Sequence, residues 1–247
     1  MSKKEAEIKE NKEINPEVEE VSAAQELLEN PEALAEQFNR TEEYVSKNRT
    51  VLLAVLTVLV CGIVGGILYS NNQKENEVKA QQAIFGAQYY FNQDSLNLAL
   101  NGNTSNKGFL KIAKDFSDTK AGNLANYYTG VIYLQKGEFE NAIKFLSKFS
   151  SDDELVGPRA YSLIGDANME LEKYPEAVKA YTKASTSKIN KGYTPRYLLK
   201  LAIAQESAGD VKGSTATYDK IIKEYKNSKE ATTAKKYKGL VSSLAKK

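Results

Sequence analysis

Hydrophobic residues form one long uninterrupted run near the start of the chain and a helical pattern after it. The run extends from Thr50 to Ser70 and holds 21 residues without a charge or a proline. At the rise of an α-helix it spans roughly 30 Å, the thickness of a bilayer's hydrocarbon core. Because lipid offers backbone groups no hydrogen-bond partner, the run predicts one transmembrane helix.

Other interpretations of the run fit its residues less well. A secretory signal has a short basic start and a small-residue cleavage site, whereas 49 residues precede this run and residues 69–73 offer no such site. A lipoprotein signal would need small residues before Cys61, where Val58, Leu59 and Val60 stand. A buried core helix is rarely so long and so free of charge. We therefore expect an uncleaved span.

Positive charges flanking the run predict its orientation. Arg40, Lys47 and Arg49 precede it closely, against Lys74 and Lys79 after it. Lysine and arginine favour the cytoplasmic side, and a first helix behind a short tail usually leaves that tail inside. We expect residues 1–49 to form a cytoplasmic tail and residues 71–247 to lie outside the cytoplasm.

The remaining chain shows apolar residues at helical spacing, broken by short polar turns and repeated in register. Gly130 and Gly165 correspond, 35 residues apart. An aromatic residue follows each glycine by nine positions and an alanine by twelve, namely Phe139 and Ala142, then Tyr174 and Ala177. This pattern resembles the tetratricopeptide repeat, a helix-turn-helix unit of about 34 residues.

The repeat also gives physical expectations for single positions. The two glycines would let paired helices approach closely, Tyr133 and Phe139 would fill the space between them, and Gly137 suits a left-handed turn. A third, poorer unit begins at Thr194 and has Ala202, Gly209, Val211, Ser214 and Tyr218 at matching offsets.

Helical segments flank these units. Residues 75–91 could continue from the membrane helix and pair with residues 109–116 as a distorted first unit, with an insertion that includes the polar stretch 101–106. Residues 231–245 suit a solvating cap helix. The predicted fold is all-α: one transmembrane helix followed by a tetratricopeptide-repeat solenoid.

In such arrays the first helix of each unit lines the concave face. Aromatic residues at helical spacing are more often core residues than ligand-binding ones. Counting from the aligned glycines nevertheless places ten residues on the concave face as candidate protein contacts: Tyr127, Val131, Arg159, Ser162, Asp166, Met169, Arg196, Leu199, Ile203 and Glu206. The asparagines of the family's carboxylate clamp are not found at the required places, so a dedicated site for a C-terminal carboxylate is not expected.

Composition excludes most catalytic chemistry. The chain has no histidine and a single cysteine, Cys61, inside the apolar run. The commonest general base and metal ligand are therefore absent, as are nucleophile pairs built on histidine. No phosphate-binding or dinucleotide-binding glycine pattern occurs. We expect no enzyme activity, catalytic residue, cofactor, metal site or small-molecule substrate.

Charge separates the two ends of the chain. Residues 1–49 hold 7 Lys or Arg and 13 Asp or Glu, net −6, whereas residues 71–247 hold 27 and 19, net +8. Basic residues are dispersed along the domain, which argues against nucleic-acid binding.

The tail is charged and predicted to be partly disordered, with short helices nearer the membrane. Asn30, Pro31 and Glu32 favour a helix start. The following segment could dock on a cytoplasmic partner or lie against lipid headgroups with Tyr44 at the interface. Within the span, Gly62 and Gly66 would allow close packing of another membrane helix.

The whole architecture resembles YfgM-type proteins, and residues 119–130 (TKAGNLANYYTG) look like the version found in Bacteroidota. That resemblance implies a non-enzymatic, single-pass protein of the bacterial inner membrane with a periplasmic repeat domain. It implies an ancillary role at the SecYEG-type translocon, with a PpiD-like chaperone and unfolded exported proteins as partners. The alternative is a structural scaffold of another envelope assembly, such as outer-membrane protein biogenesis.

Overall fold

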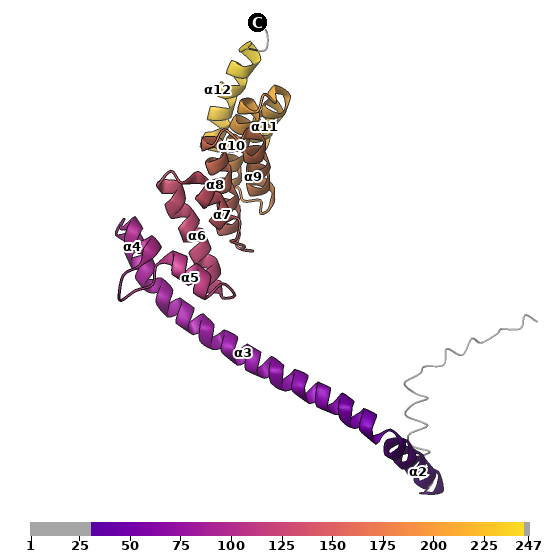
Figure 1. Ribbon diagram of the computed structural model, residues 1–247. Helices are drawn as coiled ribbons and strands as arrows, with labels where there is room; N and C mark the ends of the chain where they lie inside the picture. The colour runs from indigo at the N-terminus through magenta and orange to yellow at the C-terminus, as the bar shows by residue number, and fades with distance from the viewer. Residues whose placement is uncertain (1–30, 245–247) are drawn as a thin grey trace, which may run out of the picture. The chain divides into compact units, whose positions relative to one another are not determined.

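The computed structural model describes residues 31–244, and the part of the chain it describes is helical apart from short connections (Figure 1). The helices are α2 (Pro31–Lys47), α3 (Arg49–Asn92), α4 (Leu96–Asn101), α5 (Phe109–Asp115), α6 (Lys120–Gln135), α7 (Phe139–Leu146), α8 (Val156–Glu170), α9 (Tyr174–Thr186), α10 (Thr194–Ser207), α11 (Val211–Glu224) and α12 (Lys229–Leu244). Two compact units meet in sequence between Tyr69 and Ser70.

The first unit contains α2 and the apolar part of α3. Helix α2 begins at Pro31, as its missing N–H favours; the predicted cap Asn30 lies outside the described residues. Glu32 in the first turn and Lys47 in the last complement the helix dipole. The side chains of Phe38 and Tyr44 are exposed.

Helix α3 joins two segments that the sequence predicts separately, because the apolar run and residues 75–91 form one uninterrupted helix. It is long and apolar enough to cross a membrane, and none of its apolar stretch is buried in the protein. A Cβ added at Gly62 or Gly66 would meet no atom within 4 Å. Within residues 31–244 the structure thus supplies one candidate membrane span.

The second unit begins with the end of α3, which packs on α5 and α6. Ala80, Ile84 and Ala87 share one buried face of α3. Phe109 from α5 stacks on the ring of Tyr128 at 4.8 Å between centroids. The insertion before α5 is more ordered than its polar sequence suggests: it contains α4, and the Asn103 amide donates to the Tyr90 hydroxyl at 2.7 Å.

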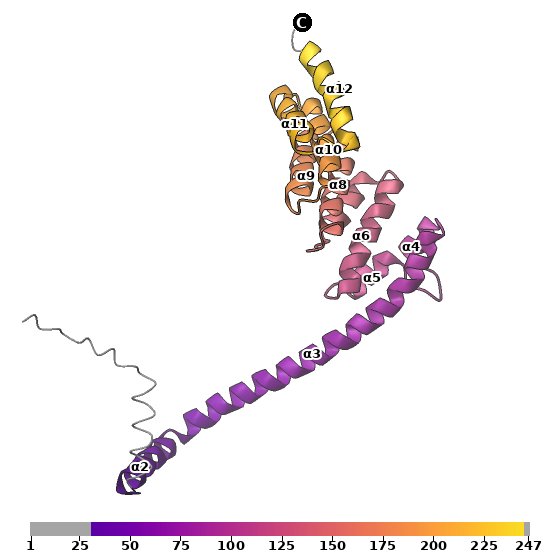
Figure 2. The same ribbon diagram turned by 180° about the vertical axis from the view of Figure 1, so that it is seen from behind.

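Helices α6 to α11 form three helix pairs, α6–α7, α8–α9 and α10–α11, and each pair packs on the next (Figures 1 and 2). The glycines permit this packing as predicted. A Cβ on Gly130 would lie 2.5 Å from Cγ of Leu146, and one on Gly165 would lie 2.5 Å from the ring of Tyr181.

A left-handed residue ends the first helix of every pair, seven positions after the aligned small residue. Gly137 has φ +74° and Gly209 φ +80°, and the middle position is Glu172 with φ +57°. The expected left-handed turn at Gly137 is confirmed. Glu172 shows that the turn persists where glycine is absent.

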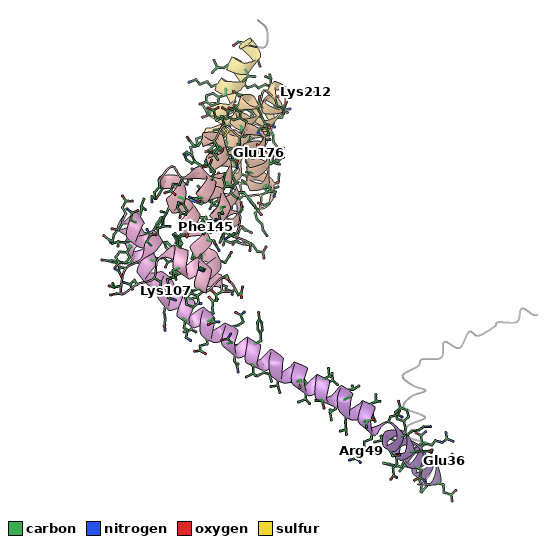
Figure 3. The ribbon with its side chains drawn as sticks, viewed as in Figure 1. Glu36, Arg49, Lys107, Phe145, Glu176 and Lys212 are labelled. Atoms are coloured by element: carbon green, nitrogen blue, oxygen red, sulfur yellow. The ribbon has the colours of Figure 1, made fainter. Side chains whose placement is uncertain are left out.

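Helix α12 covers the end of the array. Ala231, Ala234 and Val241 are buried against α10 and α11, while its opposite face, including Lys235, is exposed. This agrees with the predicted cap helix. The sticks of Figure 3 show how densely side chains fill the array compared with α3.

Candidate protein-binding groove

A groove of about 490 Å³ lies on the array, lined by the first helices of the three pairs. Its walls come from α6, α8 and α10 and from the residues that lead into α8 and α10. The lining residues are Leu124, Tyr127, Tyr128, Leu155, Val156, Arg159, Ser162, Leu163, Asp166, Tyr193, Arg196, Tyr197 and Lys200.

Two proline–arginine pairs place the positive charge of the groove. Pro158-Arg159 and Pro195-Arg196 stand in the first turns of α8 and α10, where a proline leaves no helical hydrogen bond unmade. Both arginines lie six positions before the aligned small residue of their unit, where the first unit has Leu124. They are the only arginines among residues 71–247, whose other 25 basic residues are lysines.

Tyrosines line the groove together with these guanidinium groups, among them Tyr127, Tyr193 and Tyr197. Burial raises the pKa of the Tyr127 hydroxyl, and the nearby positive charge of Arg159 opposes that rise. Burial also raises the pKa of Tyr197, opposed by both Arg159 and Arg196. Tyr193 stands beside Tyr197 and is 43% exposed. The two charges therefore lie among phenol rings whose hydroxyls can donate hydrogen bonds.

The groove's one carboxylate is already bound within the protein. Lys200 donates to both carboxylate oxygens of Asp166 at 2.7 Å, and the Tyr181 hydroxyl donates to the same group at 2.6 Å. This network ties together α8, α9 and α10. The pKa of Tyr181 is raised chiefly by burial and further by the charge of Asp166. Asp166 and Lys200 thus balance each other and fix the groove's geometry.

The predicted concave residues divide into two groups. Tyr127, Arg159, Ser162, Asp166 and Arg196 all line the groove. Val131, Met169, Leu199, Ile203 and Glu206 do not.

The second group lies toward the C-terminal ends of the first helices or in the last unit. Met169 and Leu199 are half-buried and pack against the core shared with α12. The Glu206 carboxylate accepts a hydrogen bond from the Tyr218 hydroxyl at 2.5 Å. The groove therefore does not reach the last turn of these helices.

Sequence reasoning missed several lining residues, of which Tyr128, Tyr193, Tyr197 and Lys200 carry polar groups. One signal was present: the position of Arg159 and Arg196 recurs at Leu124, and all three line the groove. Nothing in the repeat pattern indicated Tyr193, because it precedes the helix that the pattern aligns.

Comparison with protein families covers the last two helix pairs. Residues 158–188 and residues 196–228 each match a model described as tetratricopeptide repeat. The array is a tetratricopeptide-repeat solenoid. Repeats of this kind typically build non-enzymatic scaffolds that mediate protein–protein interaction. No curated protein sequence matches the chain.

The match to residues 196–228 confirms the third tetratricopeptide unit, which departs from the pattern at Ser214 and Val211. Ser214 takes the alanine position without cost because its hydroxyl, although buried, donates to the carbonyl of Val211 at 3.0 Å. Val211 can replace an aromatic residue because its side chain is 44% exposed and fills no interior space.

Proposed function

We propose that this protein is a membrane-anchored adaptor of protein export, whose groove binds segments of partner proteins beside a SecYEG-type channel. The partners are a PpiD-like periplasmic chaperone, newly exported unfolded proteins, or both. The observation that supports this most directly is a groove lined by tyrosines and two arginines on a tetratricopeptide array, in a chain that also carries an apolar helix.

The lining suits a segment of polypeptide. Tyrosine offers a large rigid contact surface and a hydroxyl at a low cost in conformational entropy. Leu124, Leu155 and Leu163 add apolar surface, while the arginines supply polar contacts that fix the orientation of what binds. A groove of about 490 Å³ accommodates a few side chains at a time, as an adaptor for extended segments requires.

In this proposal α3 crosses the bacterial inner membrane once, with residues 1–49 in the cytoplasm and the repeat domain in the periplasm. The flanking Arg40, Lys47 and Arg49 favour that orientation. Lipid surrounds the apolar stretch, and Gly62 and Gly66 offer a surface for a neighbouring membrane helix.

Co-purification of the tagged full-length protein in a gentle detergent tests the proposal. We expect enrichment of SecY and PpiD homologues over an untagged control. A variant with an unrelated transmembrane helix in place of residues 50–70 separates recognition by the helix from simple anchoring. Recovery of neither homologue would contradict the export role, and recovery of outer-membrane assembly proteins instead would favour the scaffold alternative.

A further inference from the structure

We infer that the groove recognises side-chain carboxylates of an extended acidic segment in its partner protein, through Arg159 and Arg196. The inference rests on the proposed function only in taking the groove as the surface that binds a partner; it adds the chemistry of what is bound.

The charge of the groove is uncompensated. Its ionisable side chains with formal charge are Arg159, Arg196, Lys200 and Asp166, and the last two form an ion pair. Among residues 31–244, none of the six ion pairs includes Arg159 or Arg196. Both arginines are exposed. The groove thus presents two positive charges that no carboxylate of the described chain neutralises, and an acidic ligand complements them.

The side-chain type points to carboxylates rather than to diffuse negative charge. A guanidinium presents parallel N–H donors that match a carboxylate in a bidentate arrangement, whereas an ammonium is a point charge. The domain uses lysine for its other 25 basic positions and arginine only here. Tyr127 and Tyr197 lie beside the guanidinium groups, and their hydroxyls are further donors.

The arginine and leucine side chains along the groove indicate which kind of protein segment it can bind. Arginine occupies the same position in the second and third units, and the first unit has Leu124 there. Leu155 and Leu163 also line the groove. The matching ligand is an extended segment with two acidic side chains next to a large apolar one. A protein segment supplies that apolar contact, which an inorganic anion does not.

The test uses the full-length protein in detergent and a fluorescein-labelled peptide in which glutamates alternate with leucine and tyrosine, blocked at both ends. Fluorescence anisotropy should show binding that weakens as salt increases, because the contacts are ionic. The same peptide with glutamine in place of glutamate should bind roughly tenfold or more weakly, because it loses the charge-assisted hydrogen bonds.

Matched variants locate the contact. Arg159→Gln and Arg196→Gln should each weaken binding several-fold, and the double variant should abolish it. Arg159→Lys should fall between Arg159→Gln and the unchanged protein, because lysine keeps the charge and loses the bidentate contact. The control is the double variant Lys212→Gln with Lys235→Gln, which removes the same charge at exposed positions on α11 and α12 outside the groove lining (Figure 3, where Lys212 is labelled). It should bind like the unchanged protein.

Several outcomes would overturn the inference. These are equal binding of the glutamate and glutamine peptides, unchanged binding by the arginine double variant, and binding only by a peptide with a free C-terminal carboxylate. Displacement of the peptide by vesicles of anionic phospholipid would assign the arginines to a membrane surface instead.

The two proposals fail separately. Loss of the SecY and PpiD homologues from co-purification, with peptide binding retained, would remove the export assignment alone. Retained co-purification by the arginine double variant, with no peptide binding by the unchanged protein, would remove the acidic-segment inference alone.

Discussion

At the scale of single residues, two positions in the array depart from the rule that buried or strained groups are compensated. The side chain of Thr129 is fully buried in α6, and its hydroxyl has no hydrogen-bond partner within residues 31–244. Glu172 adopts the left-handed conformation that Gly137 and Gly209 adopt in the neighbouring units. Each departure costs stability and leads to a substitution that should restore it.

Thr129→Val should stabilise the protein by about 1–2 kcal/mol, because valine has nearly the same shape and removes the cost of an unpaired buried hydroxyl. Urea unfolding followed by circular dichroism measures the change. Thr182→Val is the matched control, since the exposed hydroxyl of Thr182 donates to the carbonyl of Val178. A loss of stability in Thr129→Val would show that the hydroxyl does find a partner.

Glu172→Gly should raise stability by about 0.5–1 kcal/mol, since relief of the left-handed conformation exceeds the added entropy of the unfolded chain. Gly137→Ala is the reverse experiment and should lower stability by about 1 kcal/mol. A Cβ at Gly137 meets no atom within 4 Å, so conformation alone is tested. Equal midpoints for the two variants in urea would contradict the assignment of strain.

At the scale of helices, the distance between the members of a pair is set by the aligned glycines. Gly130 lies against Leu146 of α7, and Gly165 lies against the ring of Tyr181 of α9. Tyr181 also donates to Asp166, which Lys200 holds from α10. Packing of one helix pair therefore determines where the charged groups of the groove stand.

Gly165→Ala should destabilise the protein by about 1–3 kcal/mol, because the new methyl group overlaps the Tyr181 ring. Gly239→Ala in α12 is the control, since no atom lies within 4 Å of its Cβ position. It should stabilise by about 0.5–1 kcal/mol through helix propensity. Thermal unfolding distinguishes the two, and a neutral Gly165→Ala would mean that the helices separate at no cost.

Most of the helices and their pairing can be predicted from the sequence, and the exceptions have physical causes. The aligned glycines and alanines identify the helix pairs because close packing permits few other residues there. Helix α4 escaped prediction because its short sequence, Leu96–Asn101, carries no helical period and is stabilised by burial of Ala99 and Leu100. The left-handed Glu172 escaped because glycine is the usual signal for that conformation.

The groove was only half predictable for a related reason. Periodicity identifies the face of a helix but not how far along that face the surface stays open. Met169 and Leu199 share the predicted face and yet contribute to the core, because their neighbours in the array pack against α12. Tyr193 lies before its helix, where a helical period has no meaning. Tertiary packing decides both cases.

At the scale of the whole molecule, buried tyrosines link the stability of the fold to alkaline pH. The chain has no histidine, whose charge changes between pH 5 and 8 in most proteins. Burial raises the pKa values of Tyr127, Tyr181, Tyr197 and Tyr218 above the usual value. These tyrosines must remain protonated in the folded state, whereas in the unfolded chain they ionise near their ordinary pKa of about 10.

Stability should therefore be nearly constant from pH 6 to 8 and fall as the pH rises above about 10, because the folded state then binds more protons than the unfolded state. Tyr218→Phe should make the alkaline decline shallower than in the unchanged protein, because the raised pKa of Tyr218 contributes to it. The measurement is the slope of the unfolding free energy against pH in the variant and in the unchanged protein. The slope is used rather than the stability itself, because Tyr218→Phe also removes the hydrogen bond to Glu206. Identical slopes would contradict the assignment.

The use of arginine in the groove and lysine elsewhere has a practical consequence for capturing partners. Amine-reactive cross-linkers attack lysine and leave guanidinium groups intact, and the groove's single lysine, Lys200, is held by both oxygens of Asp166. The exposed lysines around the array can therefore be covalently joined to a bound partner while the two arginines keep their contacts. The cross-linked residues would then show where the partner lies while it is bound in the groove.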